Sequence, residues 1–168
     1  TGHHDTTAGC LAAIDALHAR GHRFRNIADI GTGTGLLAFA ALHLWPRAHA
    51  IASDIDPVSV RVTAENAAVN GVILGASSGE LALVVADGTR HPLIGARAPY
   101  DLVIANILAG PLIALAPALA QIAAPGGVLM LAGLLGKQRA AVAAAYRRCG
   151  WRLDDDGGDA EWPVLRLA

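Results

Sequence analysis

The chain lacks most features of membrane, secreted and nucleic-acid-binding proteins. Its two cysteines, Cys10 and Cys149, are too few and too isolated to form a disulfide framework or a zinc site. The formal net charge is −1, so no general basic field is present to hold nucleic acid. The opening residues 1–5 carry no signal-peptide pattern. We therefore expect a cytoplasmic, reduced protein.

Charge is also missing from one long stretch, because no charged residue occurs between Asp101 and Lys137. A membrane-spanning helix needs about 20 mostly apolar residues without interruption. Helix-breaking and polar residues divide this stretch, at Asn106, Gly110, Pro111, Pro117, Gln121 and Pro125. The pieces have the length of buried strands and core helices, so the stretch predicts the interior of a layered domain and no membrane contact.

Hydrophobic residues make up 54% of the 168 residues, which excludes a disordered chain and suits one domain. Strand-like and helix-like segments alternate. Expected strands are 26–30, 49–53, 81–86, 101–105 and 127–132, with a closing pair, 151–153 and 162–167, joined by an acidic turn. Expected helices are 6–20, 36–44, 57–70, 111–123 (interrupted at Pro117) and 137–149. This order predicts an α/β fold: a doubly wound, mostly parallel, seven-stranded sheet with helices on both faces.

The most informative local pattern is Asp29-Ile30-Gly31-Thr32-Gly33-Thr34-Gly35, where a strand meets a helix. Glycines allow positive φ angles and let a ligand lie against the backbone. Free N–H groups at the start of the following helix can receive a polar or anionic group. An ordinary strand-to-helix turn needs one or two glycines, so three alternating glycines favour a nucleotide-like ligand.

The identity of that ligand stays open on the glycines alone. Gly33, Gly35 and Ala38 also fit the dinucleotide pattern G-x-G-x-x-A, with Asp54 about 20 residues further on as a ribose-binding acid. Other polar residues at strand ends favour S-adenosylmethionine over NAD. Asp29 is placed to contact a charged amino-acid group of the ligand or to fix the loop. Asp87 is placed to accept a hydrogen bond from an adenine amino group, and Asn106 faces the reaction side of the crevice.

Two sets of residues carry a family resemblance. Residues 29–35, together with Ser53-Asp54-Ile55-Asp56-Pro57, resemble the cofactor site of class I S-adenosylmethionine-dependent methyltransferases. More narrowly, residues 1–7, 65–66, 70–71 and 106–112 resemble the ribosomal protein L11 methyltransferases over nearly the whole chain. The stretch Asn-Ile-Leu-Ala-Gly-Pro-Leu at 106–112 is the most specific of these motifs.

The resemblance implies an enzyme that methylates amines of ribosomal protein L11, either lysine side chains or the N-terminal amine. It places Thr7 and Gly31 near the methionine end of S-adenosylmethionine, Asp54 on the ribose hydroxyls, and Asn106 beside the sulfonium. The displacement needs a neutral amine. We expect the Asn106 oxygen or a nearby carbonyl to accept its hydrogen bond, and the uncharged approach at 107–111 to favour the neutral form.

The resemblance also implies that residues 1–168 form the cofactor-binding catalytic domain, with residues 1–25 covering the cofactor site. The separate N-terminal substrate-recognition domain of the family is expected to be absent from this chain. Two alternatives remain. One is an NAD-dependent oxidoreductase, which is disfavoured because no Tyr-x-x-x-Lys pair occurs and Lys137 is the only lysine. The other is a cofactor-binding fragment that is inactive without the recognition domain.

Overall fold

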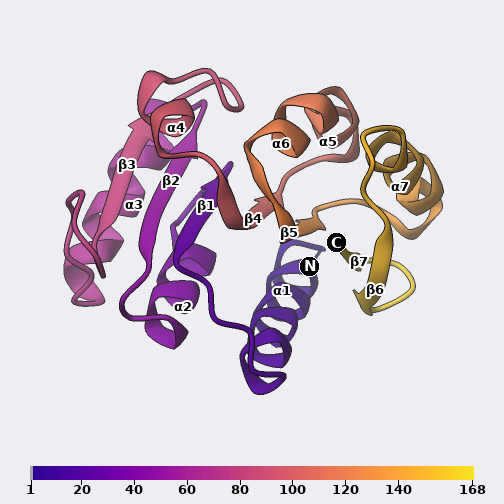
Figure 1. The fold of residues 1–168 in the computed structure, drawn as a ribbon. Helices are drawn as coiled ribbons and strands as arrows, with labels where there is room; N and C mark the ends of the chain where they lie inside the picture. The colour runs from indigo at the N-terminus through magenta and orange to yellow at the C-terminus, as the bar shows by residue number, and fades with distance from the viewer. Residues whose placement is uncertain (1) are drawn as a thin grey trace.

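A computed structural model of the chain describes residues 2–168, and shows a seven-stranded sheet with the strand order β3-β2-β1-β4-β5-β7-β6 (Figure 1). The strands are β1 (Asn26–Ile30), β2 (His49–Asp54), β3 (Leu81–Val85), β4 (Tyr100–Asn106), β5 (Ala123–Ala132), β6 (Leu153–Gly158) and β7 (Pro163–Leu167). Strands β1 to β5 are parallel to one another, and β7 runs antiparallel to both β5 and β6. The predicted doubly wound, mostly parallel sheet is confirmed.

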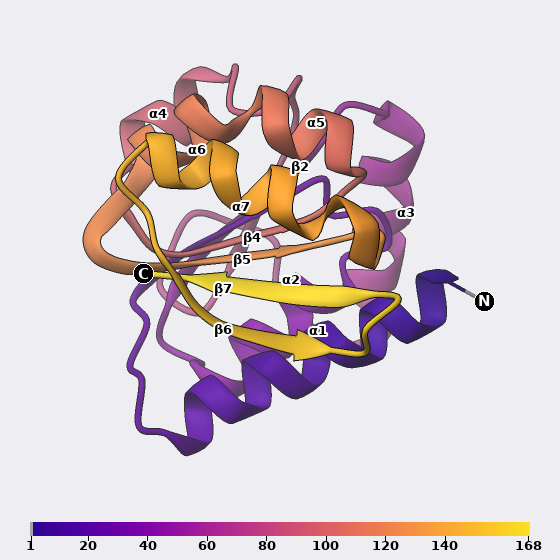
Figure 2. The same cartoon turned by 90° about the vertical axis from the view of Figure 1, so that its right-hand side faces the viewer.

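Helices cover both faces of this sheet (Figure 2). One face packs against α1 (Gly2–Ala19), α2 (Leu36–Leu44) and α3 (Pro57–Val69). The other packs against α4 (Pro92–Arg97), α5 (Ala109–Ala114), α6 (Ala116–Ile122) and α7 (Arg139–Arg148), which follows a short 3-10 turn, η1 (Gly136–Gln138). Each face has its own apolar core, as a layered α/β domain requires.

The uncharged stretch forms the middle of the molecule. In β4, Leu102 and Ile104 enter one core while Val103 and Ala105 enter the other, because successive side chains of a strand point to opposite faces. A strand buried on both faces has no place for charge. The predicted interruption at Pro117 is confirmed: α5 ends at Ala114, and α6 begins with this proline in its first turn. Residues 2–168 contain no helix of the length and apolarity needed to cross a membrane.

Apart from the earlier starts of α1, at Gly2 instead of residue 6, and of β5, at Ala123 instead of residue 127, the structure corrects two sequence predictions. The acidic stretch expected as a turn lies mostly within β6, and the turn itself forms at Asp159, whose Oδ1 accepts from the N–H groups of Glu161 (2.9 Å) and Trp162 (2.6 Å). An edge strand tolerates acids because one side faces solvent, and Asp154 pairs with Arg166 there at 2.8 Å. The second correction is α4, which was not predicted. It is a single short turn of helix, capped by the His91 side chain, which accepts from Leu93 N–H at 3.1 Å.

Candidate functional site

The polar residues singled out in the sequence meet at one edge of the sheet. Four neighbouring parallel strands end there, leading into Gly31 after β1, Asp54 at the end of β2, Asp87 after β3 and Asn106 at the end of β4. The chain leaves β1 toward β2 on one side and returns to β4 on the other, so the strand order reverses at β1. Ligands of open α/β sheets bind at this kind of reversal.

Two adjoining cavities open at this edge, and both are lined by Gly31. The Thr7 cavity has a volume of about 340 Å³ and is lined by Thr7, Asp29, residues 31–34 and Asn106 among others. The Asp54 cavity has a volume of about 400 Å³ and includes Asp54, Asp87, Ile107, Leu108, Pro111 and Leu115 in its lining. Together the cavities bring seven of the eight predicted site residues to one place.

Asp29 is a buried carboxylate in the wall of the Thr7 cavity, with 1% of its surface exposed. Its Oδ2 accepts a hydrogen bond from Thr32 Oγ1 at 2.7 Å, whereas Oδ1 has no partner among the described residues. Burial raises the pKa of Asp29 to about 6, against the opposing effect of the Thr32 and Ala38 hydrogen bonds, and the charge of Asp54 adds to the increase. An unpartnered buried carboxylate oxygen is an acceptor for a cationic or hydrogen-donating ligand group.

The three glycines of the turn have different roles. Gly31 has φ +77° and lies directly under Ile107, so that a side chain at position 31 would collide with the Ile107 side chain. Gly33 lines the Thr7 cavity, and its N–H donates to Asp54 Oδ2 at 2.9 Å. Gly35 (φ +87°) is the N-cap of α2, packed against Phe39 and Thr63, and lines neither cavity. The structure therefore brings Gly31 and Gly33 to the site, but not Gly35.

The two acids of the Asp54 cavity are held differently. Asp54 accepts one backbone hydrogen bond on each oxygen, from Gly33 at Oδ2 and from Asp56 at Oδ1 (3.0 Å). Each carboxylate oxygen has a further lone pair, so Asp54 can also accept from ligand hydroxyls. Asp87 is exposed and forms an ion pair with Arg90 at 3.2 Å. Arg90 was not predicted as a neighbour of the site, since it follows the third strand in an unpatterned loop.

Asn106 lies between the polar and apolar parts of the site. It is partly buried in the lining of the Thr7 cavity, and its carboxamide forms no hydrogen bond with any residue that the structure describes. The next residue, Ile107, donates its N–H to Ala132 O at 3.1 Å, which holds the turn after β4 against β5. Beyond it, the uncharged residues Ile107, Leu108 and Pro111 line the Asp54 cavity.

Sequence reasoning did not predict that α3 supports the glycine turn, although Asn66 belongs to the 65–66 family motif. Thr63 Oγ1 donates to Gly33 O at 2.9 Å, and Asn66 Nδ2 donates to Thr34 O at 3.0 Å. Thr32, which donates to Asp29, was not singled out either. Thr63 and Asn66 are three residues apart and share one face of the helix, a spacing that was visible in the sequence. The contact between this helix face and the glycine turn depends on tertiary packing and could not be read from the spacing.

A sequence model of the family described as ribosomal protein L11 methyltransferase matches residues 1–168. The chain belongs to this family. The ribosomal protein L11 methyltransferase of Sinorhizobium fredii is 49% identical over 148 residues, which is 87% of this chain and 48% of the relative. That of Brucella suis is 46% identical over 150 residues, covering 89% of this chain and 50% of the relative. The chain thus spans about half the length of the curated relatives it matches.

The fold agrees with this family assignment. The crystal structure of a ribosomal protein L11 methylase from Lactobacillus delbrueckii subsp. bulgaricus superposes with a TM-score of 0.79 at 28% identity, covering 98% of this chain and 78% of that chain. Membership in the L11 methyltransferase family decides against the NAD-dependent oxidoreductase that the glycine pattern also allowed.

Proposed function

We propose that the chain is the catalytic part of an S-adenosylmethionine-dependent methyltransferase that modifies lysine side chains or the N-terminal amine of ribosomal protein L11. The observation that carries this proposal is the pair of joined cavities at the carboxyl edge of β1, β2, β3 and β4. Unpartnered Asp29 Oδ1 and the unbonded Asn106 carboxamide line one cavity, and Asp54 lines the other. Family membership supports the same reaction.

The residues present suit the two halves of S-adenosylmethionine. In the Thr7 cavity, Asp29 offers a carboxylate oxygen to the ligand's ammonium group, and Thr7 with the turn at 31–34 surrounds the amino-acid end. In the Asp54 cavity, Asp54 would accept from the ribose hydroxyls and Asp87 from the adenine amino group. Gly31 joins the cavities without a side chain to separate them. Gly35 supports the turn from behind, a role that does not require ligand contact.

The bound ligand supplies a sulfonium methyl group, which the lone pair of a neutral amine displaces. The protein's task is to position that amine and keep it uncharged. Asn106 is placed to accept a hydrogen bond from the amine, which fixes the direction of its lone pair. Ile107, Leu108 and Pro111 surround the approach with apolar groups, and a dry environment lowers the pKa of a lysine ammonium.

We further propose that residues 1–168 act as one cytoplasmic catalytic domain whose first helix helps to close the ligand site. Thr7 of α1 lines the Thr7 cavity, while the rest of that helix packs along α2 and the two antiparallel strands β6 and β7. The curated relatives are about twice as long as this chain. A second hypothesis is therefore that the chain binds S-adenosylmethionine but modifies L11 only together with a substrate-recognition domain.

One experiment separates these readings. Calorimetry with S-adenosylmethionine, S-adenosylhomocysteine and NAD measures ligand choice, and mass spectrometry measures methyl groups on purified L11. The assay is run with and without the N-terminal domain of a full-length relative, and Asn106→Ala serves as the inactive control. Methylation by the chain alone supports the main proposal, whereas methylation only with the added domain supports the second reading. Binding of NAD alone would contradict both.

A further inference from the structure

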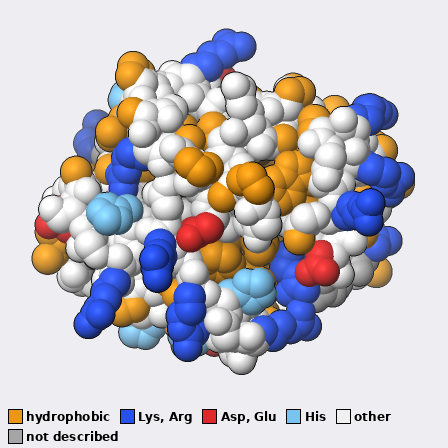
Figure 3. Space-filling view, in the orientation of Figure 1, with side chains coloured by type: hydrophobic (Ala, Val, Ile, Leu, Met, Phe, Trp, Pro, Cys, Tyr) orange, Lys and Arg blue, Asp and Glu red, His pale blue; other side chains and the backbone are white. Residues whose placement is uncertain are grey.

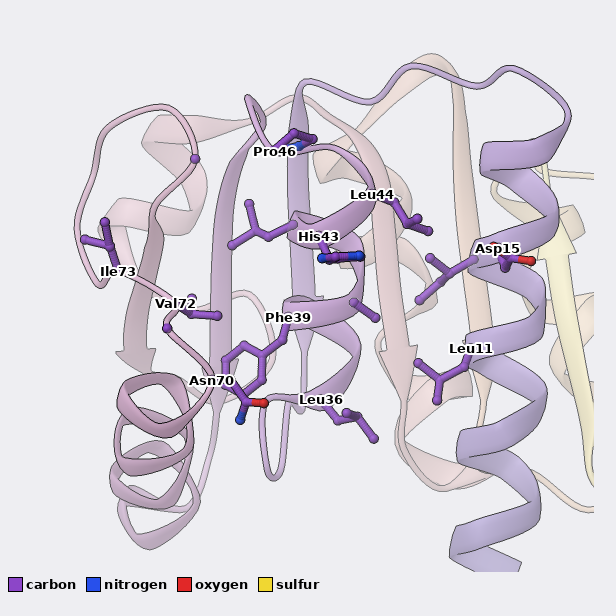
Figure 4. Close-up of a pocket in the computed structure, with 15 residues that line it drawn as sticks. Leu11, Asp15, Leu36, Phe39, His43, Leu44, Pro46, Asn70, Val72 and Ile73 are labelled. Atoms are coloured by element: carbon purple, nitrogen blue, oxygen red, sulfur yellow. The ribbon is translucent and has the colours of Figure 1, made fainter.

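A further large cavity among the described residues shares one lining residue, Leu36, with the Thr7 cavity. It is a groove of about 660 Å³ that follows α2 from Leu36 to Pro46 (Figure 4). The α2 side chains Phe39 and His43 line its floor. Leu11 of α1 lies on one side, and Val72 with Ile73, in the connection from α3 to β3, lies on the other. We call this the α2 groove.

The α2 groove has unusually exposed apolar borders. Ile73 is 65% exposed and Leu36 is 44% exposed, although both line the groove. Val69 and Leu74, on either side of the groove-lining segment 70–73, are also exposed. Single apolar side chains on a surface need no explanation, but a contiguous group around a concave surface is typical of a protein-binding site.

A basic cleft continues the α2 groove at the C-terminal end of α2. The cleft has a volume of about 480 Å³ and shares Leu44 and Pro46 with the groove. Three arginines line it, Arg23, Arg25 and Arg47, and none of them forms an ion pair with a carboxylate in the described part of the chain. On the face seen in Figure 3, Lys and Arg side chains gather along the lower edge.

The acidic residues of this region do not neutralise the arginines. Among the described residues that line the α2 groove or the basic cleft, Asp15 is the one acid, against three arginines. Asp101 uses both carboxylate oxygens to accept backbone N–H groups, from Arg25 at 2.8 Å and Asn26 at 2.9 Å. In a chain with a net charge of −1, the cleft is a local concentration of positive charge.

We propose that the α2 groove and the basic cleft together dock an acidic amphipathic segment of a protein partner. Its apolar side chains would fill the groove, as in helix-in-groove recognition, and its carboxylates would face Arg23, Arg25 and Arg47. Charge complementarity excludes a basic segment. The groove shares Leu36 with the lining of the Thr7 cavity but contains none of the residues assigned to methyl transfer, so the proposal does not depend on the proposed function.

The cleft suits a protein partner better than RNA. Its aromatic residues, Phe24 and Trp45, are only 7% and 4% exposed, so their ring faces are closed to bases. They pack edge to face with a centroid distance of 4.8 Å, and Trp45 Nε1 donates to His22 O at 2.8 Å. Single-stranded nucleic acids are bound by open aromatic faces as well as by positive charge. The α2 groove beside the cleft is lined mostly by apolar residues, with no Lys or Arg to bind phosphate groups.

The test uses fluorescence anisotropy with the full 168-residue chain and a labelled peptide of about 16 residues, leucines on one helical face and glutamates elsewhere. Two control peptides replace the leucines by serines or the glutamates by lysines. We expect only the acidic amphipathic peptide to bind. Ile73→Ser and Arg47→Glu should each lower the affinity for this peptide by about fivefold or more.

Matched controls use residues outside both cavities. Leu153→Ser changes an exposed apolar residue of β6, and Arg152→Glu reverses an exposed charge, so each should alter peptide affinity by less than about twofold. Circular dichroism and S-adenosylhomocysteine calorimetry verify that every variant is folded. Equal binding of the lysine peptide, or unchanged affinity in Ile73→Ser and Arg47→Glu, would overturn the proposal. So would tighter binding of a 12-nucleotide RNA, or a dimer of the chain that Ile73→Ser dissociates.

Discussion

Asp29 and Asp101 lie on the neighbouring strands β1 and β4, toward opposite ends of the sheet. Asp101 is at the amino end, partly exposed, and both of its oxygens accept backbone N–H groups from residues 25 and 26. Asp29 is near the carboxyl end, fully buried, with one oxygen bonded to Thr32 and the other without a partner. The same residue type is therefore satisfied at one end and left incomplete at the other.

The difference in hydrogen bonding between Asp101 and Asp29 distinguishes a carboxylate that stabilises the fold from one that is available to a ligand. Asp101, whose two oxygens both accept backbone N–H groups, stabilises the chain entry into β1 and lines neither cavity of the site. A buried carboxylate with an unused oxygen costs stability, because its charged form is desolvated without full compensation. Such a cost is expected where a ligand completes the site. Four substitutions test the contrast between the two ends.

The largest effect is expected for Asn106→Ala at the carboxyl end. Without the carboxamide, the amine loses the acceptor that orients it, so kcat for methyl transfer should fall by about 10²- to 10³-fold. Affinity for S-adenosylhomocysteine, measured by calorimetry, should change much less. Asn106→Asp keeps an acceptor oxygen and should therefore lose less turnover than Asn106→Ala. An equal loss in both variants would show that the acceptor oxygen is not what matters.

Asp29→Asn should alter stability in a pH-dependent way. The unfolded carboxyl titrates near its ordinary pKa of 3.8 and the folded one near 6. Between these two pKa values the folded state binds more protons than the unfolded state, so the free energy of unfolding falls as the pH rises from about 3.8 to about 6. In Asp29→Asn, which has no titrating carboxyl group there, this decrease in unfolding free energy should be smaller by up to about 3 kcal/mol. Urea unfolding of both proteins from pH 3.5 to 7 measures the difference.

The same substitution probes ligand binding. If ionised Asp29 meets the ligand's ammonium, affinity of the native chain for S-adenosylhomocysteine should rise with pH through about 6 and then level. Asp29→Asn should abolish this rise while leaving affinity for methylthioadenosine, which lacks the amino-acid group, unchanged. A loss of affinity for both ligands would show that Asp29 acts only by fixing the turn.

Asp54→Ala should weaken the adenosine half of the site. Affinity for S-adenosylhomocysteine and for methylthioadenosine should fall together, by roughly 10- to 30-fold, because the ribose hydroxyls lose a charged acceptor. Asp87→Ala is the matched comparison. Its exposed carboxylate already pairs with Arg90, so the expected loss is only a few-fold. Calorimetry with both ligands distinguishes this pattern from that of Asp29→Asn.

Asp101→Ala should have the smallest effect, and only on stability. Two backbone N–H groups lose their acceptor at a partly exposed site, so unfolding free energy should drop by about 1 to 2 kcal/mol. Ligand affinities should remain those of the unmodified chain. A clear change in S-adenosylhomocysteine affinity would mean that the two ends of the sheet are not independent.

Much of the fold was predictable because its signals are local. The bounds of β1 and α2 match the sequence prediction residue for residue, since each is an apolar segment bounded by a turn. Asp56 caps α3 as expected, its Oδ1 accepting from Val58 N–H at 2.9 Å. The acidic part of β6 was mistaken for a turn because pairing with β7, and not composition, makes it a strand.

The site was predictable as a group of residues but not as a geometry. The glycine turn, Asp54, Asp87 and Asn106 follow from the rule that parallel strands end at one edge. By sequence alone, Gly35 is indistinguishable from Gly31 and Gly33, and only packing against Phe39 and Thr63 places it behind the turn. The support from α3 depends on a helix whose partner lies about 30 residues earlier in the chain.

The sequence by itself determined the layered α/β fold, the family and the edge of the sheet at which the predicted site residues meet, because strand periodicity, turn glycines and motifs are encoded in short segments. Tertiary structure decided which polar atoms are satisfied. Asp29 and Asp101 look alike in the sequence, yet burial and the number of nearby N–H groups leave only Asp29 with an unused oxygen. The α2 groove and its basic cleft also exist only in three dimensions, because they join side chains from α1, α2 and two loops.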